Sequence, residues 1–228
     1  MIAVAPTTAA GRAARHDRLR VNEIFHSLQG EADTAGYPTV FVRLTGCPLR
    51  CQYCDTEYAF HAGDWVDIDA IIDRVASFGA EYVCVTGGEP LAQPNCLTLL
   101  SRLCERGFKV SLETSGAMDI AAVDARVARV VDVKTPGSRE AHRNRLENLS
   151  FLRPGDQLKF VICSRDDYEW SKDFLATHAL HGRCQILFSP SYTEISPREL
   201  AEWILADRLK VRFQLQLHKV LWGDTPGK

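Results

Sequence analysis

From Thr39 onward, short apolar runs alternate with stretches in which apolar residues recur every three or four positions. Apolar runs bounded by Gly, Pro or polar residues predict β-strands, and the wider spacing predicts amphipathic helices. We therefore expect strands at 39–44, 81–86, 108–114, 129–135, 157–163, 184–189 and 212–217, and a short strand or hairpin at 21–27. Helices are expected at 67–78, 96–104, 140–152, 168–180 and 197–206.

Strands that alternate with helices predict right-handed crossovers between parallel strands. The chain has 228 residues, whereas a complete barrel of eight such units typically takes about 250. The expected fold is therefore α/β: an incomplete TIM-like (β/α) barrel with mostly parallel strands, in a single domain over residues 21–228. Residues 1–20 are rich in Ala and Arg. We expect a disordered leader there, although the same composition fits a transit peptide.

Composition narrows the class of protein. The chain is 46% hydrophobic and 25% charged with a net charge of −2, which argues against a broad basic surface for nucleic acid. No apolar run approaches the roughly 18 residues of a membrane span. We therefore expect neither nucleic acid nor a membrane as a partner. Five isolated cysteines are expected to be buried free thiols in a reducing cytoplasm: Cys84, Cys96, Cys104, Cys163 and Cys184.

Polar or glycine-rich segments follow several of the predicted strands. Because ligands gather at the carboxyl ends of parallel strands, these segments are expected to surround one site. They are residues 46–54, 87–90, 113–116, 132–135, 189–192 and 218–219.

Three cysteines lie close together in the first of these segments, at Cys47, Cys51 and Cys54. Soft thiolate ligands suit an iron–sulfur cluster, and three of them leave one iron of a [4Fe–4S] cluster without a protein ligand. A structural zinc site needs a fourth ligand, which would be His61 or a remote cysteine. The spacing favours a cluster, and a zinc-binding module is the alternative.

This cysteine spacing resembles that of the radical S-adenosylmethionine superfamily, in which the open iron binds S-adenosylmethionine. Tyr53 precedes the last cysteine, as is common there, and Gly87, Gly88, Glu89 and Pro90 resemble the motif that contacts the methionine amino group. The resemblance implies a [4Fe–4S] cluster and S-adenosylmethionine as cofactors, and a flavodoxin-like or other reductant as a partner. A glycyl-radical-enzyme activase is the alternative function within the superfamily.

Further motifs at 23–31, 54–56, 113–116 and 216–219 occur in order along the chain. Together they resemble the 7-carboxy-7-deazaguanine synthases over residues 21–222. The resemblance implies a usually homodimeric enzyme that converts 6-carboxy-5,6,7,8-tetrahydropterin into 7-carboxy-7-deazaguanine with loss of ammonia, on the route to queuosine and tRNA modification. It also implies that a radical derived from S-adenosylmethionine drives the ring contraction, and that Mg²⁺ assists.

The resemblance assigns residues to each part of the site. Cys47, Cys51 and Cys54 would hold the cluster, and Thr56 would bind Mg²⁺. The S-adenosylmethionine site would comprise Tyr53, Cys54, Asp55, Gly87, Gly88, Glu89, Gly116, Asp132, Val133, Lys134, Ser189, Pro190, Ser191 and Tyr192. The substrate would contact Leu28, Gln29, Gly30, Glu31, Arg43, Thr114 and His218. No side chain is expected to act as a catalytic acid, base or nucleophile.

The chemistry of several side chains agrees with these roles. The planar guanidinium of Arg43 suits a substrate carboxylate. Glu31 can accept hydrogen bonds from the amino-pyrimidinone edge of a pterin. A neutral oxygen such as that of Thr56 suits Mg²⁺, which takes few protein ligands beside substrate and water.

Overall fold

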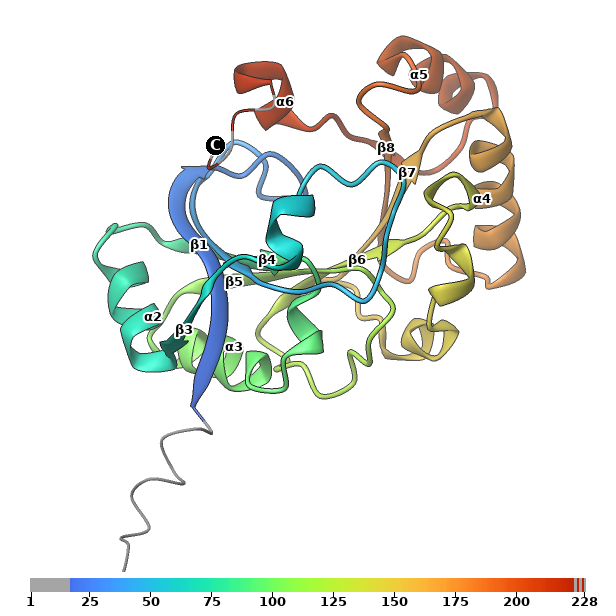
Figure 1. Ribbon diagram of the computed structural model, residues 1–228. Helices are drawn as coiled ribbons and strands as arrows, with labels where there is room; N and C mark the ends of the chain where they lie inside the picture. Colours follow the sequence, from blue (N-terminus) through green and yellow to red (C-terminus); the bar gives the residue numbers. More distant parts are fainter. Residues whose placement is uncertain (1–16, 224, 226, 228) are drawn as a thin grey trace, which may run out of the picture.

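The computed structural model describes residues 17–223, 225 and 227. Its strands are β1 (Arg18–Leu28), β2 (Pro38–Leu44), β3 (Asp64–Asp67), β4 (Tyr82–Gly87), β5 (Lys109–Thr114), β6 (Ala128–Val133), β7 (Gln157–Ile162), β8 (Gln185–Pro190) and β9 (Arg212–Phe213). They form one sheet in the order β3-β1-β2-β4-β5-β6-β7-β8-β9. The sheet curves around a central space but does not close within the described residues, so the incomplete barrel is confirmed (Figure 1).

The strands from β2 to β9, with β3 left out, pair in parallel, as the sequence predicts. Helices cover the outside of this parallel part: α2 (Ile68–Ala76), α3 (Cys96–Glu105), α4 (Arg165–Thr177) and α5 (Pro197–Ala206) (Figure 1). Each connection returns the chain so that the next strand runs in the same direction. The carboxyl ends of the parallel strands therefore share one end of the barrel.

The core lies between the outer face of the sheet and these helices. Ile68, Ile71, Ile72 and Val75 occupy one face of α2 and are fully buried, because a spacing of three and four residues places them on one side of the helix. Alternate strand residues supply the other half of the core, for example Leu158, Phe160 and Ile162 of β7. The residues between them face the interior of the barrel.

The predicted helix at 140–152 is wrong. The structure has two short 3₁₀ segments there, η4 (Ala141–Arg143) and η5 (Leu146–Phe151). The side chain of Asn144 bonds both the backbone N–H and the C=O of Lys134, and Asn148 donates to the C=O of Gly116. These asparagines bond neighbouring strand ends, and such side-chain bonds compete with a continuous helix.

The predicted last strand at 212–217 is too long. β9 stops at Phe213, and α6 (Leu217–Trp222) follows, so His218 lies on a helix and not at the end of a strand. The side-chain amide of Gln214 accepts from the N–H of Ala32 at 3.0 Å and donates to its C=O at 2.9 Å. A side chain thus takes the place of strand pairing between this segment and the loop after β1.

The amino-terminal region also differs from the prediction. β1 begins at Arg18 and pairs antiparallel with β2 and with β3, an exposed edge strand that the sequence pattern did not reveal. The predicted leader therefore extends too far, because its residues 18–20 belong to β1 and Leu19 is buried. Its residues 1–16 lie outside the described part of the chain. None of the described helices is long and apolar enough to cross a membrane.

Candidate active site

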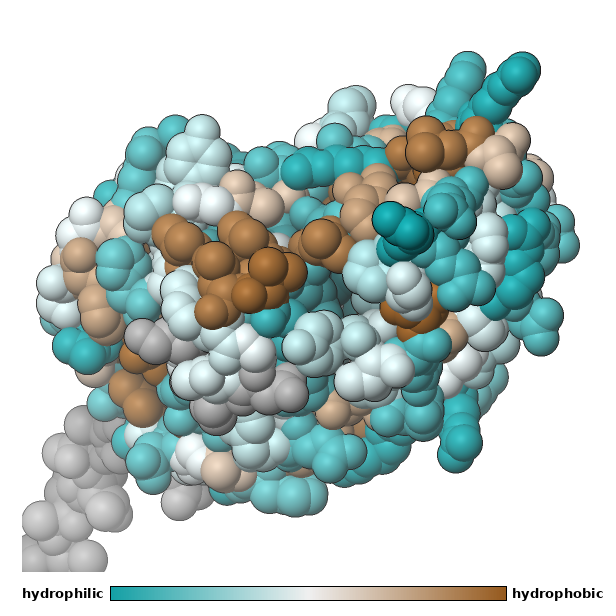
Figure 2. Space-filling view, turned by 90° about the horizontal axis from the view of Figure 1, so that it is seen from above, coloured by the Kyte–Doolittle hydropathy of each residue, from teal (hydrophilic) through white to brown (hydrophobic). Residues whose placement is uncertain are grey.

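A cavity of about 480 Å³ opens at the carboxyl ends of the parallel strands. Figure 2 shows this face of the molecule from above, with a hollow at its centre. The cysteine loop after β2 forms one side of the cavity. Inward-facing residues of the strands form the opposite wall, and Gln216 and Lys219 approach from the carboxyl-terminal segment.

The cysteine loop is held against the loop that follows β4. Glu89 donates its backbone N–H to the carbonyl of Gly46 at 2.8 Å, and Gly88 donates to the carbonyl of Leu44 at 3.1 Å. A Cβ atom on Gly88 would lie 2.3 Å from the Gly46 carbonyl oxygen and 2.8 Å from the Cβ of Cys47. Gly88 therefore permits a backbone approach that no other residue allows.

Cys47, Cys51 and Cys54 are free thiols that line the cavity. Burial raises the pKa of Cys47, and it raises the pKa of Cys51 to about 11, while the Lys134 ammonium opposes both shifts. Three soft donors on one loop beside an open cavity fit a cluster that keeps one iron accessible. Among the described residues, no group of three His, Cys, Asp or Glu side chains is arranged to hold a single metal ion.

Glu89 braces the ends of β4 and β5. Its carboxylate is fully buried and accepts hydrogen bonds from the backbone N–H groups of Leu91 and Ser115 and from the hydroxyls of Thr114 and Ser115. Both carboxylate oxygens are therefore engaged within the protein. Glu89 lies behind the cavity wall and orients Thr114 and Ser115, which line it.

Replacing Glu89 by Gln should lower the free energy of unfolding by about 2–4 kcal/mol, because the new amide nitrogen would face donors and leave buried N–H groups unpaired. Urea denaturation of the apoprotein measures the change. Glu105→Gln, at the exposed end of α3, is the matched control and should change stability by less than about 0.5 kcal/mol. Equal stability of the two variants would contradict the bracing role.

Buried Lys134 pairs with half-buried Asp132 beside the cysteines, with 2.9 Å between Lys134 Nζ and Asp132 Oδ2. Burial alone would lower the pKa of Lys134, but Asp132 and Cys51 raise it above its usual value, so the ammonium stays charged. Asp132 Oδ1 and the Tyr53 hydroxyl are buried without a hydrogen-bond partner in the described part of the chain. Because buried polar atoms are normally paired, these two oxygens are available to a bound ligand.

Arg43 also lines the cavity, near the end of β2. Its Nε donates to Glu23 Oε1 at 2.7 Å, and the Tyr58 hydroxyl donates to the same oxygen at 2.9 Å. No described residue accepts a hydrogen bond from the terminal nitrogens of Arg43. The ion pair thus fixes the direction of the guanidinium and leaves its outer edge for a carboxylate.

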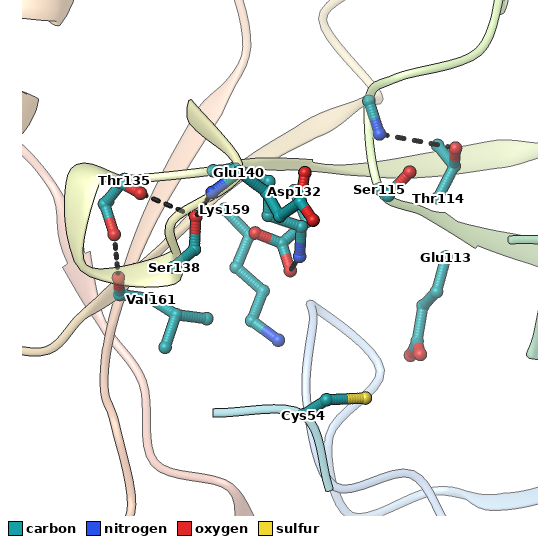
Figure 3. A network of polar contacts seen from close by, with 12 residues as sticks. Cys54, Glu113, Thr114, Ser115, Asp132, Thr135, Ser138, Glu140, Lys159 and Val161 are labelled. Carbon is teal, nitrogen blue, oxygen red and sulfur yellow. Dashed lines mark hydrogen bonds and ion pairs between the residues drawn. The ribbon is translucent and has the colours of Figure 1, made fainter. Parts of the chain in front are cut away.

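An acidic side chain, Glu113, and a basic side chain, Lys159, also line the cavity. Glu113 accepts from Gln29 Nε2 at 3.3 Å and from Thr86 Oγ1 at 3.0 Å. Lys159 pairs with Glu31, whose other oxygen accepts from Gln216 Nε2 at 2.8 Å. Figure 3 shows Cys54, Glu113 and Lys159 directed into one space from the cysteine loop, β5 and β7.

Burial and the partner's charge have opposite effects on the pKa values of Glu31 and Lys159. Burial would raise the pKa of Glu31, but Lys159 lowers it below its usual value, and Glu31 in turn raises the pKa of Lys159. Both groups are therefore charged near neutral pH. His218 lies next to this pair, and burial lowers its pKa, which favours the neutral imidazole. The backbone of Gly30 lies against His218, because a Cβ on Gly30 would be 2.2 Å from its Nδ1.

The structure brings most of the predicted site residues together. Those that line the cavity are Arg43, Cys47, Cys51, Tyr53, Cys54, Asp55, Thr56, Gly87, Gly88, Thr114, Asp132, Lys134, Ser191 and Tyr192. Those that do not line it are Leu28, Gln29, Gly30, Glu31, Glu89, Gly116, Val133, Ser189, Pro190 and His218. Several of the second group bond a lining residue, as Gln29 bonds Glu113, whereas Val133 packs in the core.

Some lining residues had no predicted role: Thr86, Glu113, Lys159, Gln216 and Lys219. Glu113, Gln216 and Lys219 lie within the sequence motifs, and this was a usable signal. Lys159 lies inside an apolar strand. Burying a charged side chain without a partner costs free energy, so the position of Lys159 in the sequence indicated that it has an acidic partner.

Comparisons with known proteins agree with this geometry. The radical SAM superfamily model matches residues 41–134. The 7-carboxy-7-deazaguanine synthase of Chlorobaculum tepidum is 46% identical, over 92% of this chain and 97% of that protein. Its counterpart in Koribacter versatilis is 41% identical, over 92% of this chain and 100% of that protein. The crystal structure of QueE from Escherichia coli has a similar fold, with a TM-score of 0.74 and 24% identity over 93% of this chain and 100% of that chain.

These findings indicate which cofactors the cysteine loop binds. Membership of the radical SAM superfamily implies a [4Fe–4S] cluster and S-adenosylmethionine as cofactors, and the free thiols beside the cavity fit that cluster. Identity of this extent over nearly the whole of two relatives also fixes the narrower group. The chain belongs to the 7-carboxy-7-deazaguanine synthase family of the radical SAM superfamily.

Proposed function

We propose that this protein converts 6-carboxy-5,6,7,8-tetrahydropterin into 7-carboxy-7-deazaguanine with loss of ammonia, in queuosine and related deazapurine biosynthesis. The observation that carries the proposal is the content of the cavity. It brings together three free thiols, an arginine fixed by Glu23, and the carboxylates of Glu113 and Asp132.

The polar groups complement the substrate. The outer edge of Arg43 would bind the pterin carboxylate, held in place by Glu23. Glu113, fixed by Thr86 and Gln29, would accept hydrogen bonds from the amino-pyrimidinone edge. Thr114 lines the same wall and is oriented by Glu89. The side chains thus recognise both ends of a flat, carboxylated heterocycle.

The residues around the cysteines would hold the cofactors. Cys47, Cys51 and Cys54 would carry the [4Fe–4S] cluster, and Tyr53, Asp132 and Lys134 would contact S-adenosylmethionine through the unpaired oxygens and the ammonium. When bound, the two cofactors supply the hydrogen abstraction that starts the ring contraction. The protein positions the substrate beside them and excludes water from the cavity.

We place Mg²⁺ at Thr56, whose hydroxyl oxygen is 3.8 Å from Cys54 Sγ and lines the cavity. Thr56→Val should raise the Mg²⁺ concentration for half-maximal activity by about tenfold, since it removes one of the few protein oxygens that the ion would use. Metal titration of steady-state rates measures this. Thr56→Ser keeps the hydroxyl and should behave like the parent. A Thr56→Val variant with unchanged Mg²⁺ dependence would place the ion elsewhere.

The direct test of the function is anaerobic turnover of the cluster-reconstituted protein. With S-adenosylmethionine, dithionite, Mg²⁺ and the carboxylated pterin, we expect 7-carboxy-7-deazaguanine and ammonia in equal amounts, detected by chromatography with mass spectrometry. Consumption of S-adenosylmethionine without this product would overturn the proposal.

Three broader features belong to the same proposal. We infer a single radical SAM core domain, since all the described strands share one sheet. We infer a cytoplasmic location, which the free state of all eight cysteines supports. We also infer a homodimer, and the exposed apolar residues Leu215, Val220 and Leu221 on and beside α6 offer surface for one (Figure 2). Analytical ultracentrifugation checks the assembly.

A further inference from the structure

A lysine on α6 connects three segments at the mouth of the cavity. Lys219 Nζ is 3.4 Å from Asp55 Oδ2, on the cysteine loop, and 5.7 Å from the centre of the Tyr192 ring, after β8. All three side chains line the cavity, and those of Asp55 and Tyr192 are also partly open to solvent. α6 lies at the end of the barrel where the parallel strands finish (Figure 1). One ammonium group thus contacts both loops from the carboxyl-terminal helix.

Asp55 lies between two residues that the proposed function assigns to metals. Cys54 would bind the cluster and Thr56 would bind Mg²⁺, and we call residues 54–56 the metal turn. The backbone hydrogen bonds of the metal turn run to residues only three positions away in the sequence. Among the described residues, Lys219 is the cation that pairs with Asp55. This ion pair therefore gives the metal turn a polar contact with a distant segment.

The same helix also contacts the residues that are predicted to bind substrate. The N–H of Leu217 donates to the carbonyl of Gly30 at 2.9 Å. His218, which directly precedes Lys219, lies against the backbone of Gly30. The first turn of α6 therefore connects the substrate residues with the metal turn.

The surroundings of Lys219 favour a positioning role over a stabilising one. Its side chain is only 8% exposed, and taking an ammonium group out of water is costly. The side chain of Asp55 is 43% exposed, and an ion pair with so exposed a partner adds little to the stability of a fold. An apolar side chain of similar length would be buried at this place without that cost. The charge is therefore best explained by its effect on the site.

We propose that Lys219 is a positioning residue that holds α6 against the metal turn, so that Thr56 and His218 take their places together. The inference rests on the proposed function, which assigns Thr56 to Mg²⁺ and His218 to the substrate. Because Mg²⁺ uses few protein ligands and demands a strict geometry, a small displacement of Thr56 should weaken its binding. The ring of Tyr192 restricts the ammonium group from the other side.

Hydrogen exchange of the full-length apoprotein, followed by mass spectrometry, tests this contact without turnover. In Lys219→Met, residues 53–60 should exchange about fivefold faster than in the parent, because the metal turn loses its contact with α6. A lysine needed only for the folding of α6 would affect residues 216–222 and leave 53–60 unchanged, and that result overturns the proposal. Lys219→Arg keeps the charge and should restore the parental exchange.

Asp55→Asn tests the same contact from the other segment, and it decides the question if Lys219→Met does not fold. It should make residues 216–222 exchange about threefold faster, although the substitution lies on the cysteine loop. Unchanged exchange of residues 216–222 in this variant overturns the proposal.

Lys172→Met is the matched control. Lys172 Nζ lies 2.9 Å from Glu169 Oε2 on α4, and neither side chain lines the cavity. The control also removes one ammonium group from an ion pair, and it should leave the exchange of residues 53–60 and 216–222 at the parental rates. Equal acceleration in Lys172→Met and Lys219→Met would overturn the proposal.

Steady-state kinetics connect the contact with the reaction. Lys219→Met should raise the KM for the carboxylated pterin and the Mg²⁺ concentration for half-maximal activity by about three- to tenfold, with iron content unchanged. The double variant with Asp55→Asn should lose no more than the worse single variant, because both substitutions break one contact. Losses that multiply in the double variant would show two independent roles and overturn the proposal.

The proposed function and the role of Lys219 fail in different ways. Absence of product from the parental protein would contradict the function, while the exchange measurements on the apoprotein would still decide whether Lys219 holds the metal turn. Normal product formation by the parent, together with parental exchange in Lys219→Met, would contradict the role of Lys219 alone.

Discussion

Cys51→Ser should bring product formation below detection and remove most of the iron and sulfide from the reconstituted protein. Cys51 is one of three free thiols on the cysteine loop, and each thiolate would bind one iron. A serine hydroxyl is a harder ligand that does not ionise near neutral pH, so two thiolates would have to hold the cluster. Iron and sulfide analysis and visible absorbance measure the cluster, and chromatography measures the product.

The control for this prediction is Cys104→Ser. Cys104 is a half-buried free cysteine near the end of α3, far along the chain from the cysteine loop. Its replacement should leave iron content and turnover unchanged. A Cys51→Ser protein that retained a full complement of iron and sulfide would show that the triad is not the cluster site.

Arg43→Ala should reduce kcat/KM for the carboxylated pterin by about 10²–10³-fold, or about 3–4 kcal/mol. The substitution removes the outer edge of the guanidinium and also leaves Glu23 without its partner in a half-buried place. Cluster content should not change, because Arg43 supplies no thiolate and its Nε bonds Glu23. Steady-state kinetics with saturating S-adenosylmethionine measure the loss.

Two further variants separate binding from positioning at this residue. Arg43→Lys keeps a positive charge without the planar fork and should recover only part of the activity. Glu23→Gln removes the charge that orients Arg43, so we expect a smaller loss than with Arg43→Ala. If all three variants kept the parental kcat/KM, the substrate carboxylate would bind elsewhere.

The parallel part of the fold could be predicted because its strands are nearly continuous apolar runs that end at Gly or polar residues. The segments that were predicted wrongly depend on side-chain hydrogen bonds to residues far away in the sequence. Asn144 and Asn148 look helix-compatible in a local pattern, and only the neighbouring strand ends explain why they bond elsewhere. The edge strand β3 is short and exposed, so it carries almost no apolar signal.

In the candidate site too, features carried by a short stretch of sequence could be predicted, and contacts between distant residues could not. The cysteine loop and the glycine pair could be predicted, since residues 46–54 and 87–88 carry their chemistry within a few positions. The pairing of Lys159 with Glu31 could not, because the partners are far apart in the sequence and meet only when the barrel curves. The hydrogen bonds of the Glu89 side chain could not be predicted for a related reason: its carboxylate accepts from Thr114 and Ser115 at the next strand end.

The barrel wall is held by strand pairing everywhere except at the gap between β9 and β1. Around most of the barrel, separating neighbouring strands means breaking backbone ladders. At the gap, residues 30–32 and 214–217 are joined by the two bonds of the Gln214 amide, the bond from Gln216 to Glu31, and the bond from Leu217 to Gly30. Separating these segments breaks those bonds and leaves every strand pair intact. On this side, the barrel can therefore widen at the cost of four hydrogen bonds and of no strand pairing.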